Sequence, residues 1–234
     1  MNKETFIKEL CLLGINITDK QLCDLETYYE MLIEYNSHTN LTRITEKEDV
    51  YLKHFYDRLT LIKAIKLDSQ SILDVGTGAG FPGLVLKIVF PNLNITLVDS
   101  LNKRIIFLNS VIEKLQLKNI KAIHSRAEDF VKENKETFDV VTSRAVANMQ
   151  VLSELCIPAV KVNGYFIPMK AEVNIELDEA KKAIETLGGV LKEVIEFELP
   201  NKEGIRNLIK IQKNNKTSDK YPRKFAEIKK KPLK

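Results

Sequence analysis

The sequence has no tryptophan and only three cysteines and three histidines in 234 residues. The cysteines, Cys11, Cys23 and Cys156, form no C-x-x-C pair, and the histidines stand apart from one another. A disulfide framework or a zinc site needs such residues at short, regular spacing. We therefore expect neither of them, and we assign no residue to a metal.

A long apolar run is also absent. One of the most apolar stretches, LVLKIVF at residues 84–90, is interrupted by Lys87 and is far shorter than the roughly 20 residues that span a bilayer. The first ten residues, MNKETFIKEL, lack the apolar core of a signal peptide. We expect a cytoplasmic protein without a membrane partner, and we expect a monomer. With 44% hydrophobic and 29% charged residues, the chain fits one large domain or one domain with a small appendage.

Acidic residues are scarce in the C-terminal tail. Residues 220–234 hold seven lysines and arginines against one acid, a local charge of +6, whereas the whole chain carries +4, which leaves −2 for the other residues. The tail also lacks hydrophobic periodicity. It is therefore either a solvated, disordered segment or a surface for an acidic partner such as RNA.

The stretch SILDVGTGAGFPG at residues 71–83 organises the rest of the chain. A short apolar run leads into Gly76, Gly78 and Gly80, and a helical pattern begins at Phe81. This pattern predicts a strand, a tight turn and a helix whose N-terminus faces a ligand. A dinucleotide fingerprint, G-x-G-x-x-G, would need its third glycine at position 81. The D-x-G-x-G-x-G form resembles instead motif I of S-adenosylmethionine-dependent methyltransferases.

The order of the predicted elements indicates an α/β fold. Residues 1–66 show helical spacing, broken by the Asn- and Thr-rich segment YNSHTNLTRI at 35–44. From residue 68 onward strand and helix patterns alternate, which is typical of a parallel sheet with right-handed crossovers. The last two strand patterns, 190–198 and 206–212, have no helix between them and predict an antiparallel hairpin at the sheet edge.

We therefore expect seven mostly parallel strands in a Rossmann-like sheet, as in class I methyltransferases. The predicted parts are a helical extension at 1–66, a cofactor-binding domain at 67–213 and a basic tail at 214–234. Within them we expect one helix over 49–65, one over 146–161, and a turn at Asn163-Gly164 before a strand at 165–169.

Polar residues follow the predicted strands. The second strand ends at Asp99, where an acid is placed to accept hydrogen bonds from ribose hydroxyls; the alternative is that Asp99 only caps the next helix. The third strand is followed by SRAED at 125–129 and the fourth by SRA at 143–145. Ligands of open α/β sheets bind at this carboxyl edge.

Seven motifs, in order along most of the chain, resemble the bacterial 16S rRNA guanine-N7 methyltransferase family known as RsmG or GidB. The motifs are YNSHTNLT (35–42), DVGTGAGFPG (74–83), DSLNKRIIFL (99–108), SRAED (125–129), SRAVANM (143–149), MKAE (169–172) and YPRK (221–224). The resemblance implies transfer of a methyl group from S-adenosylmethionine to N7 of a guanosine in the 16S rRNA of the small ribosomal subunit.

The resemblance also implies site residues. The cofactor pocket would be made by Gly76, Gly78, Phe81, Asp99, Ala127, Glu128 and Arg144. Ala127 and Glu128 would flank the adenine, and Arg144 would lie where the substrate meets the methionine portion. For the RNA we expect contacts from the irregular segment and the tail, namely Asn36, Asn40, Arg43, Arg223, Lys224, Lys229, Lys230 and Lys231.

Missing motifs narrow the chemistry. The loop after the fourth strand reads TSRAV rather than the N/D-P-P-Y/F of many amine methyltransferases, and Cys156, the one candidate for ring-carbon methylation, sits in a helical pattern typical of a core residue. Guanine N7 has an exposed lone pair, so its methylation needs no base. Because the ring gains positive charge, we expect Arg144 to face a carboxylate or phosphate rather than N7.

We predict no catalytic acid or base. Three alternatives stay open from the residues: a methyltransferase acting on another RNA site, a non-catalytic RNA-binding assembly factor, and a nicotinamide-dependent reductase, which Phe81 disfavours.

Overall fold

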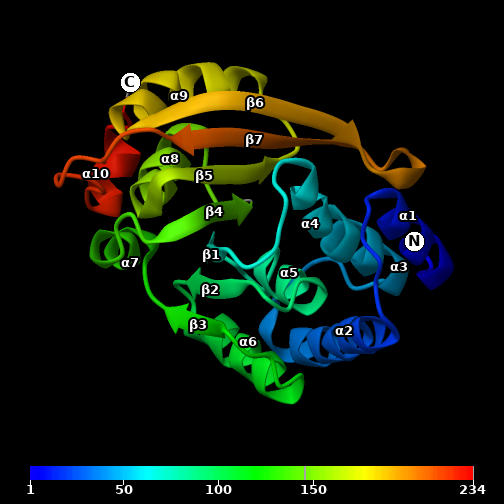
Figure 1. Cartoon of the computed structure of the whole chain (residues 1–234). Coiled ribbons are helices and arrows are strands. Elements are labelled where there is room, and N and C mark those ends of the chain that lie inside the picture. The colour runs from blue at the N-terminus through cyan, green and yellow to red at the C-terminus, as the bar shows by residue number, and fades with distance from the viewer. Residues whose placement is uncertain (145, 234) are drawn as a thin grey trace.

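The computed structural model describes residues 1–144 and 146–233, and at Asn174 only the backbone. Ala145, in the predicted loop after the fourth strand, lies outside the described residues. A seven-stranded sheet in the order β3-β2-β1-β4-β5-β7-β6 forms the centre of the molecule (Figure 1). The strands are β1 (Ser71–Val75), β2 (Asn94–Asp99), β3 (Ile120–His124), β4 (Phe138–Arg144), β5 (Val160–Lys170), β6 (Gly189–Glu198) and β7 (Ile205–Lys213).

The first five strands are parallel, and β7 runs antiparallel to both β5 and β6. The sequence therefore predicted the edge hairpin correctly. Val75 of β1 is paired with Val98 of β2 and with Ser143 of β4, so these three strands end side by side. This alignment brings the loops after β1, β2 and β4 together at one edge of the sheet.

Helices cover both faces of the sheet, because side chains of successive strand residues point to opposite faces. Ile72 packs with the N-terminal helices, α5 and α6 in one core, whereas its neighbour Leu73 packs with α7, α8 and α9 in the other. The helices are α1 (Lys3–Leu12), α2 (Asp19–Thr39), α3 (Lys47–Asp49), α4 (Asp57–Leu59), α5 (Gly83–Val89), α6 (Asn102–Lys114), α7 (Ala127–Glu133), α8 (Met149–Cys156), α9 (Asn174–Thr186) and α10 (Phe225–Lys230).

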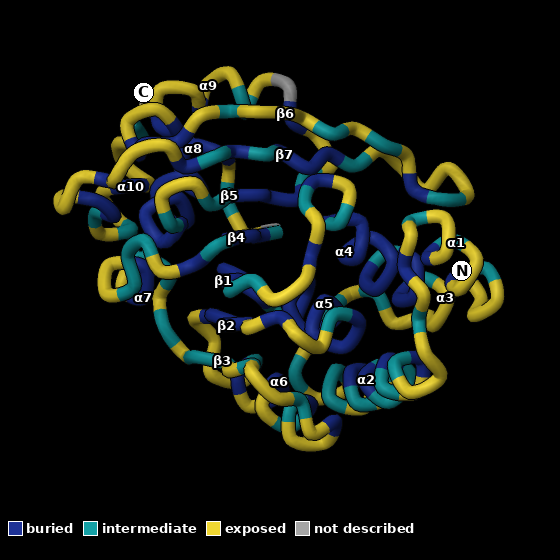
Figure 2. The backbone as a smooth tube through the Cα atoms, in the orientation of Figure 1, coloured by how far each residue is buried: buried dark blue, intermediate teal, exposed yellow. Residues whose placement is uncertain are grey.

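The N-terminal helices are joined to the sheet by a continuous core. Helix α2 begins with a capping box between Thr18 and Gln21, and its buried residue Tyr28 reaches the glycine loop, where the hydroxyl donates to the carbonyl of Ala79. The Tyr28 ring also packs beside Phe55 and Phe107, at centroid distances of 5.6 and 6.3 Å. Figure 2 shows the buried residues continuing from the sheet into these helices. Residues 1–66 thus help to hold the glycine loop in place.

Three local expectations were wrong. Residues 49–65 do not form one α-helix, since a π-helix at Val50–Tyr56 is followed by α4 and a 3₁₀ turn at Thr60–Lys63. The helix expected at 146–161 is shorter, because α8 ends at Cys156 and a 3₁₀ turn (Ile157–Ala159) contains Pro158. The turn expected at Asn163-Gly164 lies inside β5, where an irregular register with β4 absorbs the positive φ of Asn163, 72°. A bulge of this kind keeps a strand continuous through residues that favour turns.

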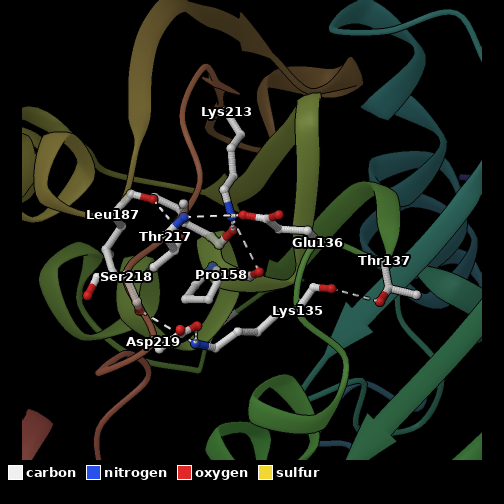
Figure 3. A network of polar contacts seen from close by, with 10 residues as sticks. Lys135, Glu136, Thr137, Pro158, Leu187, Lys213, Thr217, Ser218 and Asp219 are labelled. Carbon is white, nitrogen blue, oxygen red and sulfur yellow. Dashed lines mark hydrogen bonds and ion pairs between the residues drawn. The ribbon is translucent and has the colours of Figure 1, made fainter.

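The tail, for which the sequence suggested no structure, is docked on the domain. It follows Lys213, the last residue of β7, which is 1% exposed and whose Nζ donates to the carbonyl oxygens of Ile157 and Pro158, at 3.1 and 3.4 Å (Figure 3). Burial lowers the pKa of Lys213 to about 8, although Glu136, 3.6 Å away, opposes the shift. The Thr217 hydroxyl donates to Leu187 at 2.6 Å. The chain then continues to α10, which packs against α8.

Within the described ranges, no helix combines the length and apolar character that crossing a bilayer requires.

Candidate active site

A cleft of about 260 Å³ lies at the carboxyl edge of the sheet. The residues around it come from the ends of β1 and β2, from the loops after the first four strands, from α6, α7 and α8, and from the C-terminal segment. They are Val75, Gly76, Val98, Asp99, Ser100, Arg104, Ser125, Arg126, Ala127, Glu128, Val146, Leu155 and Phe225. Four of the predicted cofactor residues, Gly76, Asp99, Ala127 and Glu128, are therefore brought together in one cleft.

The glycine loop reaches the cleft at Gly76. Gly76 has a φ of +69°, in the left-handed region, and a Cβ added there would lie 2.4 Å from Cγ2 of Val146. Gly78 has a φ of +63°, and its N–H donates to Oδ2 of Asp99 at 2.9 Å. Both positions therefore need glycine for the backbone geometry, and Gly76 also needs it for the close approach of the next loop.

Asp99 links three parts of the cleft. Its Oδ2 accepts from the Gly78 N–H and from Nη1 of Arg104, which lies 3.0 Å away, and its Oδ1 accepts from the Leu101 N–H at 2.9 Å. The residue is only 3% exposed. A carboxylate has about four lone-pair positions, so Oδ1 keeps capacity for one further donor. The sequence indicated Arg104 only as part of the motif DSLNKRIIFL, without a role.

Asp74, at the start of the glycine motif, supports the loop from below. Its Oδ2 accepts from the Thr77 hydroxyl at 2.6 Å and from the Gly83 N–H at 2.9 Å, and the side chain is fully buried. Burial raises the pKa of Asp74 to about 6 despite these hydrogen bonds. The group is tied to the turn and the helix start and does not line the cleft.

A second group of charges, the Asp57 cluster, lies at the same edge beside β4 and β7. It consists of Asp57, Arg58, Arg144 and Arg206. Oδ2 of Asp57 is 3.1 Å from Nη1 of Arg58, 3.1 Å from Nη2 of Arg144 and 2.9 Å from Nε of Arg206. Arg144 thus faces a carboxylate, as the charge argument predicted, rather than lining the cleft.

The Asp57 cluster is buried and carries excess positive charge. Burial by itself would raise the pKa of Asp57, but Arg58, Arg144 and Arg206 together hold it below its usual value. Three guanidinium groups face this one carboxylate, which leaves a formal charge of +2. Within residues 1–144 and 146–233, Nε and Nη1 of Arg58, Nη1 of Arg144 and Oδ1 of Asp57 are buried without a hydrogen-bond partner. The cluster therefore has an excess of positive charge and three unpaired donors, which suit an anion, and one unpaired acceptor.

His54 and Phe81 lie between the glycine loop and the Asp57 cluster. Their rings stack with centroids 4.2 Å apart and planes 14° apart, and Nε2 of His54 is 2.9 Å from the Thr42 hydroxyl. Burial and the nearby Arg58 and Arg144 lower the pKa of His54 to about 3, so the imidazole is neutral at physiological pH. Phe81, predicted in the cofactor pocket, is 9% exposed and packs under the loop.

The residues predicted to contact RNA fall into two groups. The irregular segment expected at 35–44 begins only at Asn40, in the left-handed region, because α2 continues through Thr39; the prediction was wrong for residues 35–39. Asn36, in the last turns of α2, accepts the Thr42 N–H at 2.8 Å, and Arg43 is exposed. In the tail, Lys224, Lys229, Lys230 and Lys231 are exposed. Arg223 differs from these, because its guanidinium is held by the buried carboxylate of Glu154 at 2.9 and 2.6 Å.

Several site residues were missed from the sequence. Asp57 and Arg58 sit in a helical stretch that gave no signal beyond its apolar spacing, and Phe225 lies in a largely polar and basic tail without hydrophobic periodicity. Cys156 is fully buried, and burial followed by the nearby Asp74 raises the pKa of its thiol far above the usual value, so it is a core residue. In the part of the chain that the structure describes, no three acidic, histidine or cysteine side chains form a group able to hold a metal ion.

The sheet order, the glycine loop after β1 and the acid that ends β2 define a class I S-adenosylmethionine-dependent methyltransferase. An S-adenosylmethionine-dependent methyltransferase from Aquifex aeolicus has the same fold, with a TM-score of 0.53 at 18% identity over 74% of this chain and 97% of that one. The predicted fold class is confirmed.

The chain belongs to the family described as rRNA small subunit methyltransferase G, or GidB, whose model matches residues 21–209. Similar relatives named Ribosomal RNA small subunit methyltransferase G come from Lachnoclostridium phytofermentans, 51% identical over 99% of this chain and 98% of the relative, and from Bacillus subtilis, 50% identical over 100% and 99%. The chain is therefore an enzyme that uses S-adenosylmethionine. This result decides against the reductase and against the non-catalytic factor.

Proposed function

We propose that this enzyme transfers the methyl group of S-adenosylmethionine to N7 of a guanosine in the 16S rRNA of the small ribosomal subunit. We further propose that it works as a cytoplasmic monomer, with no membrane partner. One observation carries the N7 assignment: the titratable groups described in and beside the cleft are poor candidates for a base. Asp99 and Glu128, which line the cleft, are paired with Arg104 and Arg126. Beside the cleft, Asp57 is held ionised by three arginines, His54 has a pKa of about 3, and Asp74 is buried beneath the loop.

The chemistry of N7 suits such a site. The N7 lone pair attacks the methyl carbon, the carbon–sulfur bond breaks, and the sulfur keeps the bonding electrons and becomes neutral, while the positive charge passes to the guanine ring. No proton leaves the base, so the enzyme contributes orientation and exclusion of water rather than acid or base transfer. Carboxylates near the reacting groups favour both the cationic cofactor and the cationic product.

For the cofactor we propose the residues Gly76, Gly78, Phe81, Asp99, Ala127, Glu128 and Arg144. Gly76, Asp99, Ala127 and Glu128 line the cleft directly, and the free capacity of Oδ1 of Asp99 suits a ribose hydroxyl. Gly78 acts through Asp99, and Phe81 supports the loop from the side of His54. Arg144 belongs to the Asp57 cluster, so we propose that it acts on the side of the cofactor that faces the substrate.

For the RNA we propose that a phosphate completes the Asp57 cluster. Phosphate is the anion that RNA supplies, and guanidinium groups bind it in a bidentate manner. The exposed residues Lys224, Lys229, Lys230 and Lys231 would add contacts to more distant phosphates, and Asn36, Asn40 and Arg43 would contact the RNA from the helical part. Arg223 does not belong to this surface, because Glu154 already occupies its guanidinium.

The three-part division of the chain follows the same assignment. We propose that residues 1–66 form part of the wall that faces the RNA and that residues 67–213 hold the cofactor. Residues 214–234 would contact both the RNA and the cofactor.

The test is methyl transfer from labelled S-adenosylmethionine to small ribosomal subunits that lack the modification. Under single-turnover conditions with saturating cofactor, the rate should be nearly independent of pH around neutrality. The modified position should be cleaved after borohydride and aniline treatment, which detects 7-methylguanosine. A rate rising about tenfold per pH unit, as expected when a proton must be removed first, or a product resistant to cleavage, would contradict N7 as the acceptor.

A further inference from the structure

The C-terminal segment, residues 221–230, borders the cofactor cleft through Phe225. Phe225 lines the cleft together with Arg126, Ala127 and Glu128, which belong to the loop after β3 and the start of α7. Phe225 is half-buried, and part of it packs against the core that contains α8. Figure 1 shows α10 beside α7 and α8, although these helices are far from it in the sequence. No motif of the sequence placed a tail residue at the cofactor.

The segment is held at this place by specific contacts on both sides of Phe225. Glu154 is fully buried in α8, and its Oε1 accepts from the backbone N–H and from Nε of Arg223, both at 2.9 Å, while its Oε2 accepts from Nη2 at 2.6 Å. Tyr221 and Ile228 are 6% and 0% exposed. A bidentate pair to a buried carboxylate and two buried apolar anchors fix the short stretch between them.

The contacts of Phe225 lead directly to the residues proposed for the adenine. The guanidinium carbon of Arg126 lies 5.2 Å from the centroid of the Phe225 ring, and Nε of Arg126 lies 3.6 Å from Oε1 of Glu128. The ring, the guanidinium and the carboxylate thus form a connected row along one side of the cleft. An aromatic face and a guanidinium plane are the surfaces on which a purine ring stacks.

We propose that Phe225 is a cofactor-binding residue, which closes the adenine end of the cleft by packing against the purine ring, and that Arg126, beside it in the lining of the cleft, holds the ring of Phe225 in place. This proposal rests on the proposed placement of the adenine beside Ala127 and Glu128. The C-terminal segment is therefore part of the cofactor site and not only a surface for RNA. Stacking of a base on an aromatic side chain contributes about 1–3 kcal/mol, so the loss of the ring should weaken cofactor binding by roughly 5- to 150-fold.

The first test is a fluorescence titration. The chain has no tryptophan, so Phe225→Trp introduces a single one at the proposed contact. Saturating S-adenosylhomocysteine should change the emission of this variant. The matched control is Phe197→Trp, in strand β6 and outside the residues that line the cleft, whose emission should not change. An emission of Phe225→Trp that S-adenosylhomocysteine leaves untouched would overturn the proposal.

The second test is calorimetry with two ligands. Phe225→Ala should bind S-adenosylhomocysteine at least about fivefold more weakly, whereas Glu227→Ala, an exposed neighbour in α10, should bind it normally. The same factor should appear with 5′-methylthioadenosine, which keeps the adenine and ribose but lacks the amino-acid portion. A loss confined to S-adenosylhomocysteine would remove Phe225 from the adenine end, and no loss would remove it from the site.

Phe225→Leu is the variant that separates the loss of the aromatic ring from a loss of folding. It keeps the apolar volume and the anchoring contacts but removes the aromatic face. We expect a native thermal unfolding midpoint and an affinity between those of the wild type and Phe225→Ala. Equal affinities of Phe225→Leu and the wild type would show that the aromatic ring has no role beyond packing.

Discussion

The cleft and the Asp57 cluster lie at the same edge of the sheet, but they differ in the balance between carboxylates and guanidinium groups. In the cleft, two carboxylates, Asp99 and Glu128, are matched by two guanidinium groups, those of Arg104 and Arg126. In the Asp57 cluster, one carboxylate serves three guanidinium groups. The charges of the first arrangement balance within the protein, although Nε of Arg104 is buried without a hydrogen-bond partner, whereas the second arrangement leaves a net positive charge.

Exposure follows the same division. The side chains of Arg104 and Arg126 are 31% and 54% exposed, so water screens them and either can move when a ligand enters. Arg58 is 4% exposed, and burial lowers its pKa to about 9. The two halves of the site therefore differ in charge and in mobility. In the half proposed for the cofactor, the charges of the side chains balance and the arginines can move. In the half proposed for RNA, the arginines are fixed by burial and their positive charge is not balanced. The predictions below test this difference.

The largest effect should come from breaking the Asp57 cluster. Asp57→Asn leaves three arginines without their shared carboxylate, and removing one partner of a buried ion pair costs about 3–5 kcal/mol. Urea unfolding measures the loss of stability. Asp178→Asn, which breaks an exposed pair with Lys181, is the control and should change stability little. Adding Arg206→Ala to Asp57→Asn should restore part of the loss, and a cycle without such coupling would contradict the shared role of Asp57.

The cleft should respond in binding rather than in stability. Asp99→Ala removes hydrogen bonds to a charged group, each of which contributes about 1.5–3 kcal/mol, so S-adenosylmethionine should bind roughly 10- to 150-fold more weakly. The protein should stay folded, because Arg104 can turn toward solvent. Calorimetry gives the affinity, and circular dichroism checks the fold. Unchanged affinity would remove Asp99 from the cofactor site.

The pH dependence of stability should report on His54, which stacks on Phe81 of the glycine loop and lies near Arg58 and Arg144 of the Asp57 cluster. Its pKa is about 3 in the folded protein and 6.5 in ordinary surroundings, so below pH 6.5 the unfolded chain takes up a proton that the folded chain does not. His54 therefore lowers stability as pH falls from 6.5 toward 3, by up to about 1.4 kcal/mol per pH unit. Above pH 6.5 it has no effect.

Asp74 must be separated from this effect. Its raised pKa of about 6 means that the folded protein holds a proton which the unfolded chain has released, so its contribution is lost as pH rises from 3.8 through 6. The measured quantity is the difference in unfolding free energy between the wild type and His54→Gln at several pH values. The contribution of Asp74 is the same in both proteins and therefore cancels in this difference. A difference that stays constant from pH 7 to pH 5 would rule out a buried, neutral His54.

The smallest effect should come from the exposed charges of the tail. Replacing Lys229, Lys230 and Lys231 with alanine should reduce the salt dependence of RNA binding by about 0.7–0.9 in log–log slope for each phosphate that the tail no longer neutralises. Affinity for S-adenosylmethionine should not change. The control replaces Lys114, Lys118 and Lys121, which are also exposed but lie around the start of β3, at the opposite edge. Equal slopes for the two triple variants would favour a merely solvated tail surface.

The sequence predicted the sheet well because its signals are local. Strand and helix patterns alternate from residue 68, and the glycine spacing places the turn directly after β1. The predictions from the sequence were wrong where contacts between distant residues decide the secondary structure. Asn163-Gly164 favours a turn by itself, but β4 pairs with Val160 before it and with Tyr165 after it, and β7 also pairs with Tyr165, so the strand continues. The π-helix at Val50–Tyr56 likewise has no local signature, since its apolar spacing also fits an α-helix.

The site was predicted in part for the same reason. Residues that directly follow a strand, such as Asp99 and Glu128, could be placed at the carboxyl edge from sequence order alone. Asp57 and Arg206 are 149 positions apart and meet only because the N-terminal helices pack beside β7. Phe225 is one of two aromatic residues in a basic tail, and its place is fixed by the pairing of Arg223 with Glu154 and by the buried Tyr221 and Ile228. Such contacts carry no periodicity that a sequence pattern could reveal.

The position of Phe225 also links the cofactor site to a local opening of the molecule. Helix α10 is attached to α8 through Arg223 and Glu154 and not through the hydrogen bonds of the sheet. It could therefore detach while the sheet and the glycine loop stay folded, and on our proposal the cleft would then lose one of its walls. A ligand that binds only the attached form shifts this equilibrium toward it. S-adenosylhomocysteine should therefore slow hydrogen exchange at the backbone amides of α10, although this helix is not part of the glycine loop.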